Sequence, residues 1–360
     1  MLHAMIMAGG GGTRFWPRSR AARPKQFLTF SGDRTLLQAT LDRIEAQVPH
    51  ERCWVITSAA HRDEALQQLP NVPADHIIGE PIGRDTAACI GLGAALIARE
   101  DPEATIIVMP ADHVIEPVQE FRRAVHAASQ LADEFPDALV TFGIRPTSPA
   151  TGYGYIHRGE FVVQRQGINS CKVQSFREKP SKETAEKYVA SGDYEWNSGI
   201  FVWRAHTILD ELARLKPEIH AGVSRIAESW GTPTRDASFD MEYLKVEKIS
   251  IDFAVMEKAK KVLVVQAPFQ WDDVGSWLAL ERRNPQDANG NTVQALHVGI
   301  NTSGCVIVSD PGRVVATIGV SNLLIIQDGD ATLVADRRDE AAVKEVVERL
   351  KKTPGLEKYL

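Results

Sequence analysis

Four consecutive glycines, Gly9–Gly12, follow an apolar run of strand length, and two cations stand close behind them in the sequence. Glycine lets a backbone approach a ligand closely, and exposed backbone N–H groups can cradle phosphate oxygens. Arg14 almost directly follows the loop, and Lys25 is placed next to the rigid Pro24. A strand that leads into such a loop beside two cations is suited to hold a polyphosphate. The glycines alone would fit a flexible turn equally well, and the cations favour the phosphate site.

The loop matches neither of the two common nucleotide-binding motifs. A Walker loop has Lys followed by Ser or Thr after its last glycine, whereas Thr13 and Arg14 stand there. A dinucleotide fingerprint needs a third glycine that opens a helix and an acid about twenty residues further on. The segment 15–17, Phe-Trp-Pro, is not typical of a helix start. A nicotinamide-dependent dehydrogenase is therefore disfavoured.

A carboxylate follows a strand-like run elsewhere in the chain. The run 105–109 is apolar and rich in β-branched residues, and Asp112 comes just past its end. Carboxylate oxygens are ligands that Mg²⁺ prefers, commonly one or two of them together with substrate phosphates. An isolated Asp at this place more often caps the next segment, so the residues alone leave both interpretations open.

The bulk composition bounds the class of protein. The 360 residues are 44% hydrophobic and 24% charged, with a net charge of −6 and no long basic run. This argues against a general nucleic-acid binder, which usually carries a basic stripe. Four widely spaced cysteines without a CxxC pair predict neither a disulfide framework nor a zinc site. Without a signal segment or a membrane-spanning apolar stretch, we expect a cytoplasmic protein with no membrane or nucleic-acid partner.

Strand-like and helix-like segments alternate through the first half of the chain. The predicted helices cover 36–48, 87–99 and 121–133, and the predicted strands cover 54–57, 105–109 and 138–142. This alternation predicts an α/β fold with a Rossmann-like mixed, mostly parallel sheet that carries helices on both faces. Functional loops are then expected at the carboxyl ends of the strands.

The second half shows a different pattern. Residues 153–203 are rich in strand-like runs, which we interpret as an insertion that closes over the site, and helices are predicted over 207–215 and 252–260. The polar, turn-forming stretch 284–291 predicts a boundary. Short β runs follow it, and an amphipathic helix over 341–352 comes near the end.

We therefore predict two domains. Residues 1–284 would form a catalytic domain, and residues 285–360 a small C-terminal β module with a terminal helix. The β module would expose repetitive edges that suit self-association, so we expect a homodimer.

The motifs taken together resemble one known family. The string AGGGGTRFWP, followed by PKQF, is similar to the signature of the sugar-phosphate nucleotidyltransferases. Its Phe-Trp-Pro and Pro-Lys-Gln-Phe details resemble the mannose-1-phosphate guanylyltransferase branch. Similar motifs run in order from Met5 to Trp277. The resemblance implies a β-helix-like C-terminal module. Because the sequence stops at Leu360, we expect the short form without the isomerase domain that some longer relatives carry.

The resemblance also implies a metal site and a nucleotide site. The family's metal-binding Asp stands in the context of Asp112, and its Asp-Val-Gly-Ser-Trp motif makes Asp273, rather than the neighbouring Asp272, the second ligand to Mg²⁺. The implied catalytic residues are Arg14, Lys25, Asp112 and Asp273. The implied nucleotide-binding residues are Ala8, Gly9, Gly10, Gly11, Gly12, Thr13, Arg14, Lys25, Asp85 and Thr86. The family usually has Asn where Asp85 stands, and a carboxylate can likewise accept from guanine N–H groups.

The implied sugar-phosphate residues come from later motifs. Glu178 of the Glu-Lys-Pro motif would accept sugar hydroxyls, and Lys179 would bind the phosphate of the sugar 1-phosphate. Asn197 can both donate to and accept from a hexose. The whole implied set is Gly143, Tyr153, Gly154, Glu178, Lys179 and Asn197. The stretch 249–257 also matches the family, and we interpret it as a helix that supports the Asp273 motif.

The implied activity is transfer of GMP from GTP to mannose 1-phosphate, which gives GDP-mannose and pyrophosphate by Mg²⁺-assisted in-line attack on the α-phosphorus. Two alternatives stay open. One is a related enzyme that uses glucose 1-phosphate with UTP or dTTP. The other is a non-catalytic regulatory subunit that binds GDP-mannose, although such a subunit could dispense with Arg14, Lys25 or an acid, and all are present.

Overall fold

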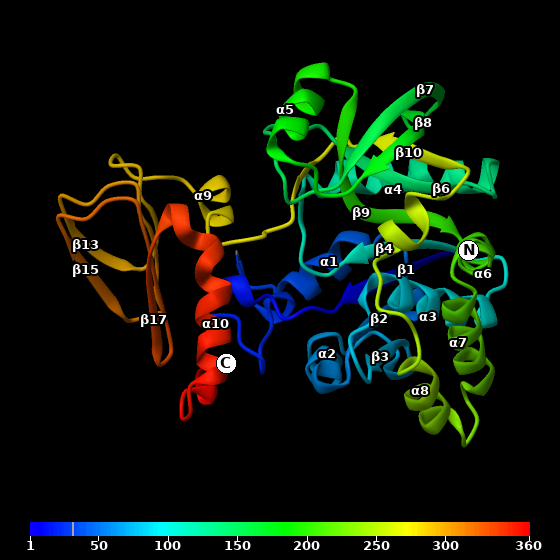
Figure 1. Ribbon diagram of the computed structural model, residues 1–360, viewed down its shortest axis with the longest axis horizontal. Helices are drawn as coiled ribbons and strands as arrows, with labels where there is room; N and C mark the ends of the chain where they lie inside the picture. The colour runs from blue at the N-terminus through cyan, green and yellow to red at the C-terminus, as the bar shows by residue number, and fades with distance from the viewer. Residues whose placement is uncertain (31) are drawn as a thin grey trace. The chain divides into compact units, whose positions relative to one another are not determined.

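The computed structural model describes residues 1–30 and 32–360, and these divide into two compact units (Figure 1). Unit 1 comprises Met1–Gly9, Gln38–Ala111 and Ile115–Trp271. Unit 2 comprises Gly10–Leu37, Asp112–Val114 and Asp272–Leu360. The segment after the first strand is thus grouped with the C-terminal residues. The domain boundary at residue 284, which was placed from the sequence, stays a prediction.

The described part of unit 1 is built on a mixed sheet with the strand order β3-β2-β1-β4-β9-β6-β10-β8-β7. The strands β3, β2, β1 and β4 run parallel to one another, and β10 is parallel to β6, whereas β9 is antiparallel to both β4 and β6. The bounds are β1 (Leu2–Ala8), β2 (Cys53–Ser58), β3 (Ile77–Glu80), β4 (Thr105–Pro110), β6 (Leu139–Ile144), β7 (Tyr155–Arg165), β8 (Ile168–Arg177), β9 (Tyr194–Arg204) and β10 (Val262–Gln266). Two further short strands are β5 (Val114–Glu116) and β11 (Gln270–Asp272).

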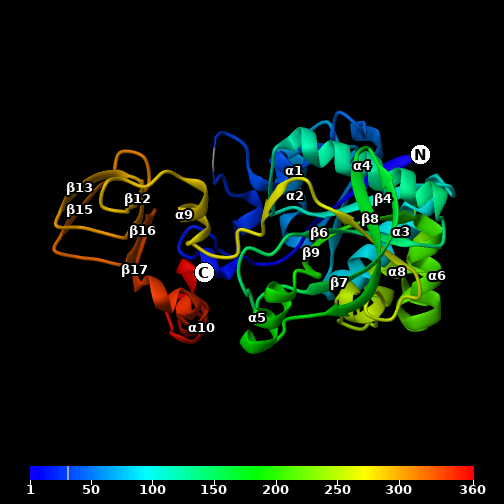
Figure 2. The same cartoon turned by 90° about the horizontal axis from the view of Figure 1, so that it is seen from above.

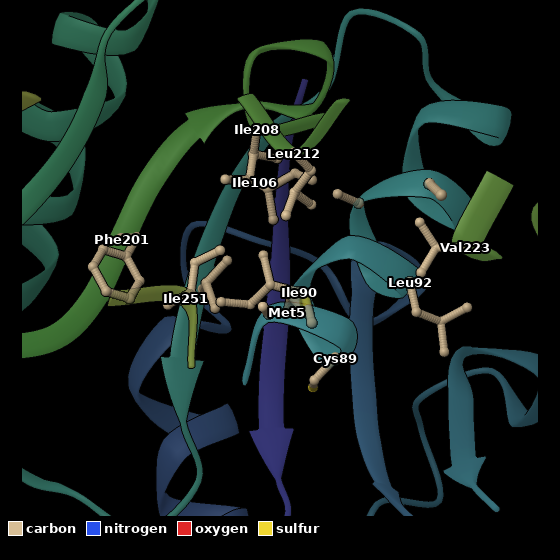
Figure 3. Close-up of a cluster of buried hydrophobic side chains, with 14 of the residues drawn as sticks. Met5, Cys89, Ile90, Leu92, Ile106, Phe201, Ile208, Leu212, Val223 and Ile251 are labelled. Atoms are coloured by element: carbon tan, nitrogen blue, oxygen red, sulfur yellow. The ribbon is translucent and has the colours of Figure 1, made fainter. Parts of the chain in front are cut away.

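Helices cover both faces of this sheet. On one face, Ile90 of α3, Leu212 of α6 and Val223 of α7 form one buried cluster with Met5 and Ile106 of the strands (Figure 3). On the other face, Phe121 of α4 contacts Phe142 and Phe269. The helices are α1 (Leu36–Ile44), α2 (Arg62–Gln68), α3 (Asp85–Glu100), α4 (Val118–Glu134), α5 (Lys182–Ser191), α6 (Ala205–Leu215), α7 (Pro217–Ser229) and α8 (Arg235–Tyr243). Within the described ranges, every helix is too short or too polar to cross a membrane.

Two predicted elements differ from the structure. The run around 200–203 was assigned to an insertion, but β9 lies inside the sheet between β4 and β6. All four side chains of this run are buried, so the strand belongs between two neighbours rather than at an edge. The helix predicted over 252–260 is a short π-helix that spans only Asp252–Met256.

Unit 2 contains a β-helix-like stack (Figure 2). The strands β12, β14 and β16 pair in parallel, and so do β13 and β15. Leu296 pairs with Val314 and Val306 with Leu324, so one coil takes 18 residues, from 296 to 314 and from 306 to 324. The antiparallel strand β17 ends the stack. The bounds are β12 (Thr292–Gln294), β13 (Leu296–Ile300), β14 (Val306–Val308), β15 (Val314–Ile318), β16 (Leu323–Asp328), β17 (Ala331–Asp336), α9 (Ala279–Arg283) and α10 (Val343–Lys352). The predicted α/β class, with a mixed sheet and a β-helix-like module, is confirmed.

Aromatic residues near the N-terminus complete the core of unit 2. Phe15 and Trp16 are buried in one cluster with Trp277 and with apolar residues of β14, β16 and α10. The Phe15 and Trp277 rings lie 5.2 Å apart, and Trp277 Nε1 donates to the Trp16 carbonyl at 3.1 Å. Trp16 Nε1 in turn donates to the carbonyl of Tyr359 at 2.8 Å. The segment that follows the glycines is therefore anchored by the C-terminal module.

The last residue of β3, Glu80, has a buried carboxyl group. Glu80 is 7% exposed, and its Oε1 accepts a hydrogen bond from the hydroxyl of Tyr243 in α8. Burial raises the pKa of Glu80 from 4.5 to about 7, and the Tyr243 hydroxyl only partly opposes this. Because the pKa of Glu80 is raised only in the folded state, protonation of Glu80 favours folding. Stability is therefore greatest at low pH and is lost as the pH rises from about 4.5 through 7.

We predict that Glu80→Gln removes this pH-dependent loss. The variant keeps an acceptor for Tyr243, and its side chain cannot ionise. The Tm of the variant minus the Tm of the wild type should therefore increase from pH 5 to pH 8. The stabilisation at pH 8 is at most about 3 kcal/mol, the equivalent of the pKa difference. Thermal unfolding followed by circular dichroism at both pH values tests this. Glu228→Gln, at an exposed position of α7, is the matched control. A Tm difference for Glu80→Gln that does not change with pH would contradict the assignment.

Candidate active site

A cavity of about 300 Å³ in unit 2 is lined by half of the residues that the sequence implied for nucleotide and metal binding, among them both carboxylates and both cations. Its lining comes from the glycine loop, from the turn after β4, from the Asp273 motif and from α10. The lining residues are Gly12, Thr13, Arg14, Phe15, Lys25, Asp112, His113, Asp273, Val274, Gly275 and Lys344. Segments more than 250 residues apart in the chain thus form one cavity with cations and carboxylates on its wall.

The glycine loop has the backbone that its sequence requires. Gly10 and Gly12 have φ of 94° and 54°, which is the left-handed region that disfavours residues with a Cβ. A Cβ on Gly12 would also collide with the side chain of Lys25. After the loop, Thr13–Phe15 forms one 3-10 turn, in which Phe15 N donates to the Gly12 carbonyl at 3.0 Å. Within this turn Arg14 is exposed, whereas Phe15 is buried.

Lys25 links the two acidic segments of the cavity. The residue is 5% exposed, and its Nζ donates to Asp112 Oδ2 at 2.7 Å and to the backbone carbonyl of Asp273 at 2.6 Å. It lies in a 3-10 turn, Lys25–Phe27, that begins after Pro24. We call this arrangement the Lys25 bridge. It places a buried positive charge against both segments that were predicted to hold a metal.

Asp112 is held in its ionised form. Burial opposes ionisation, but the charges of Lys25 and then His113 outweigh it and lower the pKa of Asp112. His113 Nε2 lies 3.9 Å from Asp112 Oδ1. The Asp112 side chain is 36% exposed, so the carboxylate can contact a ligand while it accepts from Lys25.

The two neighbouring acids at 272 and 273 have different surroundings. Asp272 forms a bidentate pair with Arg282 at 2.7 and 2.9 Å and also accepts from Val274 N. Asp273 lines the cavity, and its Oδ2 would be 2.9 Å from a Cβ on Gly275. This arrangement supports Asp273 rather than Asp272 as the residue that meets a ligand.

Unit 1 carries the residues implied for the sugar phosphate. Backbone bonds hold them together, since Lys179 N donates to the Tyr153 carbonyl at 3.3 Å and Asn197 N donates to the Gly154 carbonyl at 2.9 Å. Glu178 Oε1 pairs with Lys179 Nζ at 3.0 Å. A Cβ on Gly154 would displace the Glu178 carboxylate from its present position. Glu178, Lys179, Asn197, Tyr153 and Gly154 thus form one polar cluster.

Gly143 lies at the end of β6 and has a packing role. A Cβ there would collide with the carboxylate of Glu195, which is 4% exposed. Glu195 Oε1 accepts from Arg158 at 3.1 Å and from Gln266 at 3.0 Å. The resemblance implied a sugar-phosphate contact for Gly143. The structure adds that its missing side chain makes room for a buried carboxyl.

The remaining nucleotide-side residues lie in unit 1. Ala8 is the last residue of β1 and Gly9 follows it, and the Ala8 carbonyl accepts from Thr57 Oγ1 at 2.9 Å. Asp85 begins α3 with a φ of 64°, and its Oδ1 accepts from Thr86 N at 2.8 Å. Thr86 Oγ1 accepts from Ile251 N at 2.8 Å, so this hydroxyl anchors the start of the π-helix.

Sequence reasoning missed Lys344, which lines the cavity of unit 2 from α10. An exposed lysine on an amphipathic helix carries no signal that distinguishes it from other solvated residues. Its role depends on the packing of α10 against the 3-10 turn Thr13–Phe15, and no local pattern encodes that contact.

Comparisons with known proteins agree with these features. Residues 3–290 match the nucleotidyl transferase family, and residues 295–350 match the family of the MannoseP isomerase/GMP-like beta-helix domain. The chain is 41% identical to mannose-1-phosphate guanylyltransferase of Escherichia coli K12 over 97% of this chain and 73% of that protein. It is also 41% identical to mannose-1-phosphate guanylyltransferase of Klebsiella pneumoniae over 98% of this chain and 74% of that protein.

A solved structure gives the same result for the fold. The crystal structure of mannose-1-phosphate geranyltransferase from Thermus thermophilus superposes with a TM-score of 0.85 at 38% identity, and the match covers 97% of this chain and 99% of that one. The family resemblance inferred from the sequence motifs is confirmed. The chain belongs to the nucleotidyl transferase family, in the branch of the mannose-1-phosphate guanylyltransferases.

Proposed function

We propose that this enzyme transfers GMP from GTP to mannose 1-phosphate and releases pyrophosphate. The observation that carries the proposal is the Lys25 bridge, which joins Asp112 and the Asp273 segment in one cavity with the glycine loop and Arg14. The names of the guanylyltransferase relatives support GTP and mannose 1-phosphate as the substrates.

The reaction needs positioning more than acid–base chemistry. An oxygen of the sugar phosphate forms a bond to the α-phosphorus of GTP, and the bond from that phosphorus to the bridging oxygen breaks with its electron pair leaving on pyrophosphate. The nucleophile is already an anion, so a strong general base is unnecessary. The obstacle is to bring anions together and stabilise the charge that shifts to the leaving group.

The residues present fit a divalent cation such as Mg²⁺. Asp112 is held ionised and partly exposed, and Asp273 lines the same cavity. In the described ranges, no group of three or more His, Cys, Asp or Glu side chains could hold a metal. Substrate phosphates would therefore complete the shell around Asp112 and Asp273, as is common for Mg²⁺. When bound, the cation would neutralise phosphate charge and polarise the phosphoryl oxygens.

Arg14, Lys25 and Lys179 have distinct tasks in this proposal. Arg14, together with the loop N–H groups, would hold the β- and γ-phosphates, and Lys25 would face the α-phosphate. Asp85 and Thr86 would contact the nucleoside. Lys179 would bind the phosphate of mannose 1-phosphate, while Glu178 would accept its hydroxyls. The Lys25 bridge suits this task because it holds a buried ammonium in the cavity that would receive the phosphates.

The four cysteines, Cys53, Cys89, Cys171 and Cys305, are buried free thiols. Such thiols suit a reducing compartment, and we propose that the enzyme acts in the cytoplasm.

The proposal also includes a homodimer formed through the β-helix-like module. Leu296, Val298 and Ile300 of β13 and Val314 and Ile318 of β15 are each more than half exposed. Leu296 is in register with Val314, and Ile300 with Ile318, so these side chains form a flat apolar ladder. Large exposed apolar patches mark interaction sites, and a flat ladder can pack against its own copy.

The first test of the function is pyrophosphate release with Mg²⁺ across a grid of nucleoside triphosphates and hexose 1-phosphates. We expect GTP with mannose 1-phosphate to dominate, and Asp112→Asn to abolish the signal because it removes the ionised oxygen. A dominant signal for glucose 1-phosphate with UTP or dTTP would overturn the substrate assignment. Tight GDP-mannose binding without turnover for any pair would indicate a regulatory subunit instead.

We predict that Arg14→Ala lowers kcat/KM by ~10²–10³, the loss typical of one preorganised charge stabiliser. Arg14 is exposed, so the fold should be unaffected. Lys25→Met should cause a loss of similar size and should also lower the Tm, because it leaves Asp112 without its buried partner. Steady-state kinetics and thermal unfolding test both variants. Arg23→Ala, an exposed arginine of the same segment, is the control. Near-normal turnover in Arg14→Ala or Lys25→Met would refute the role of that residue.

We predict that the double variant Val298→Glu/Ile318→Glu is a monomer, because it would place charges inside the apolar ladder interface. Light scattering after size exclusion measures the mass of the wild type and of the variant. Val334→Glu, at an exposed position on β17 away from the ladder, should leave the dimer intact. A monomeric wild type, or a double variant that stays dimeric, would overturn this interface.

A further inference from the structure

Asp252 belongs to the polar cluster of unit 1. It lies in the stretch 249–257, which we interpreted from the sequence as a supporting helix. Asn197 Nδ2 donates to Asp252 Oδ1 at 2.8 Å. Burial, and then the nearby negative charge of Glu178, raise the pKa of Asp252 to about 6, against the effects of Asn197 and Lys179. Two carboxylates and one ammonium therefore share this cluster.

Asn197 is oriented by its own partners. Its Oδ1 accepts from Gly199 N at 3.2 Å. This backbone donor fixes which side of the amide is oxygen, and the Nδ2 group is thereby directed at Asp252. The hexose contact of Asn197 that the sequence implies stays a prediction. In the structure, the Nδ2 group of Asn197 donates to Asp252.

The backbone before Asp252 is fixed as well. Ile251 N donates to Thr86 Oγ1 at 2.8 Å, and Ala87 N donates to the Ile249 carbonyl at 3.1 Å. Asp252 then begins a π-helix, a conformation that is rare and frequently found at functional sites. Asp252 as a whole residue is partly exposed, although its segment is anchored on both sides. A fixed carboxylate on a partly exposed residue is suited to accept a hydrogen bond from a ligand.

We propose that Asp252 is a further sugar-binding residue, which accepts a hydroxyl of the hexose beside Glu178. This inference rests on the proposed function, since it needs a hexose phosphate in the cluster of unit 1. Ligand hydroxyls donate to both carboxylates and lessen their mutual repulsion, whereas Lys179 neutralises one charge. Asn197 is then a positioning residue that acts through Asp252.

The test is Asp252→Asn, which has the same shape. Its Oδ1 still accepts from Asn197, but its other atom becomes an NH₂ group that cannot accept from a hydroxyl. Calorimetry should show GDP-mannose binding ~10- to 100-fold weaker, the range for one hydrogen bond to a charged group, with GTP binding unchanged. In turnover, the KM for mannose 1-phosphate should rise by a similar factor and the KM for GTP should not.

Glu257→Gln, at an exposed position just after the π-helix, is the matched control and should leave both affinities unchanged. If Asp252→Asn fails to fold, Asp252→Ser takes its place. Unchanged GDP-mannose affinity, or equal losses for GDP-mannose and GTP, would overturn the inference.

The substrate grid separates this result from the proposed function. If another nucleotide and hexose pair dominates, the function fails, and the same comparison is made with the nucleotide sugar of that pair. The Asp252 inference is then tested by whether Asp252→Asn binds that nucleotide sugar more weakly than the wild type does. A wild-type chain that binds no nucleotide sugar would overturn both.

Discussion

The arrangement of the cavity in unit 2 depends on one buried ammonium group. Lys25 contacts both acidic segments, because its Nζ donates to the carboxylate of Asp112 and to the backbone carbonyl of Asp273. Two carboxylates brought to one cavity without a cation would repel each other. With Lys25 in place, Asp112 stays ionised. The same charge that would stabilise a reacting phosphate therefore also keeps the metal-binding carboxylate in its useful form.

This arrangement explains why the glycine loop and the C-terminal module belong to one compact unit. Lys25 can hold its position only if the chain around it is rigid, and Phe15 and Trp16 provide that rigidity by packing against Trp277 and the β-helix-like coils. The Trp277 motif also contains Asp273, so one hydrophobic cluster supports the loop, the lysine and an acid. A module that looks like an appendage in the sequence is thus part of the wall of the cavity, and Lys344 of α10 lines it directly.

The sequence allowed the fold class, most strands and helices and the family to be predicted, because periodic apolar patterns and contiguous motifs are local. Long-range pairings were less accessible. The position of β9 within the sheet follows from burial on both sides of residues 200–203, which a short apolar run does not distinguish from an edge strand. Asp252 was hidden for a similar reason: its motif was visible, but its contact with Asn197 joins segments 55 residues apart. Lys344 gave no signal at all. Contacts of this kind exist only after folding, so composition and spacing cannot reveal them.

Two candidate site residues, Asp85 and Lys179, and Val274 next to Asp273 have a left-handed backbone, which shows how the loops are built. Asp85, Lys179 and Val274 have φ of 64°, 46° and 46°. This conformation costs roughly 1–2 kcal/mol for a residue with a Cβ, and most for a β-branched one such as Val274. Asp85 lessens the cost, since its short side chain bonds the next backbone N–H at 2.8 Å. Asn shares this property, so Asp in place of the usual Asn preserves the backbone at the start of α3. The change affects the chemistry offered to a base, and it leaves the shape of the loop intact.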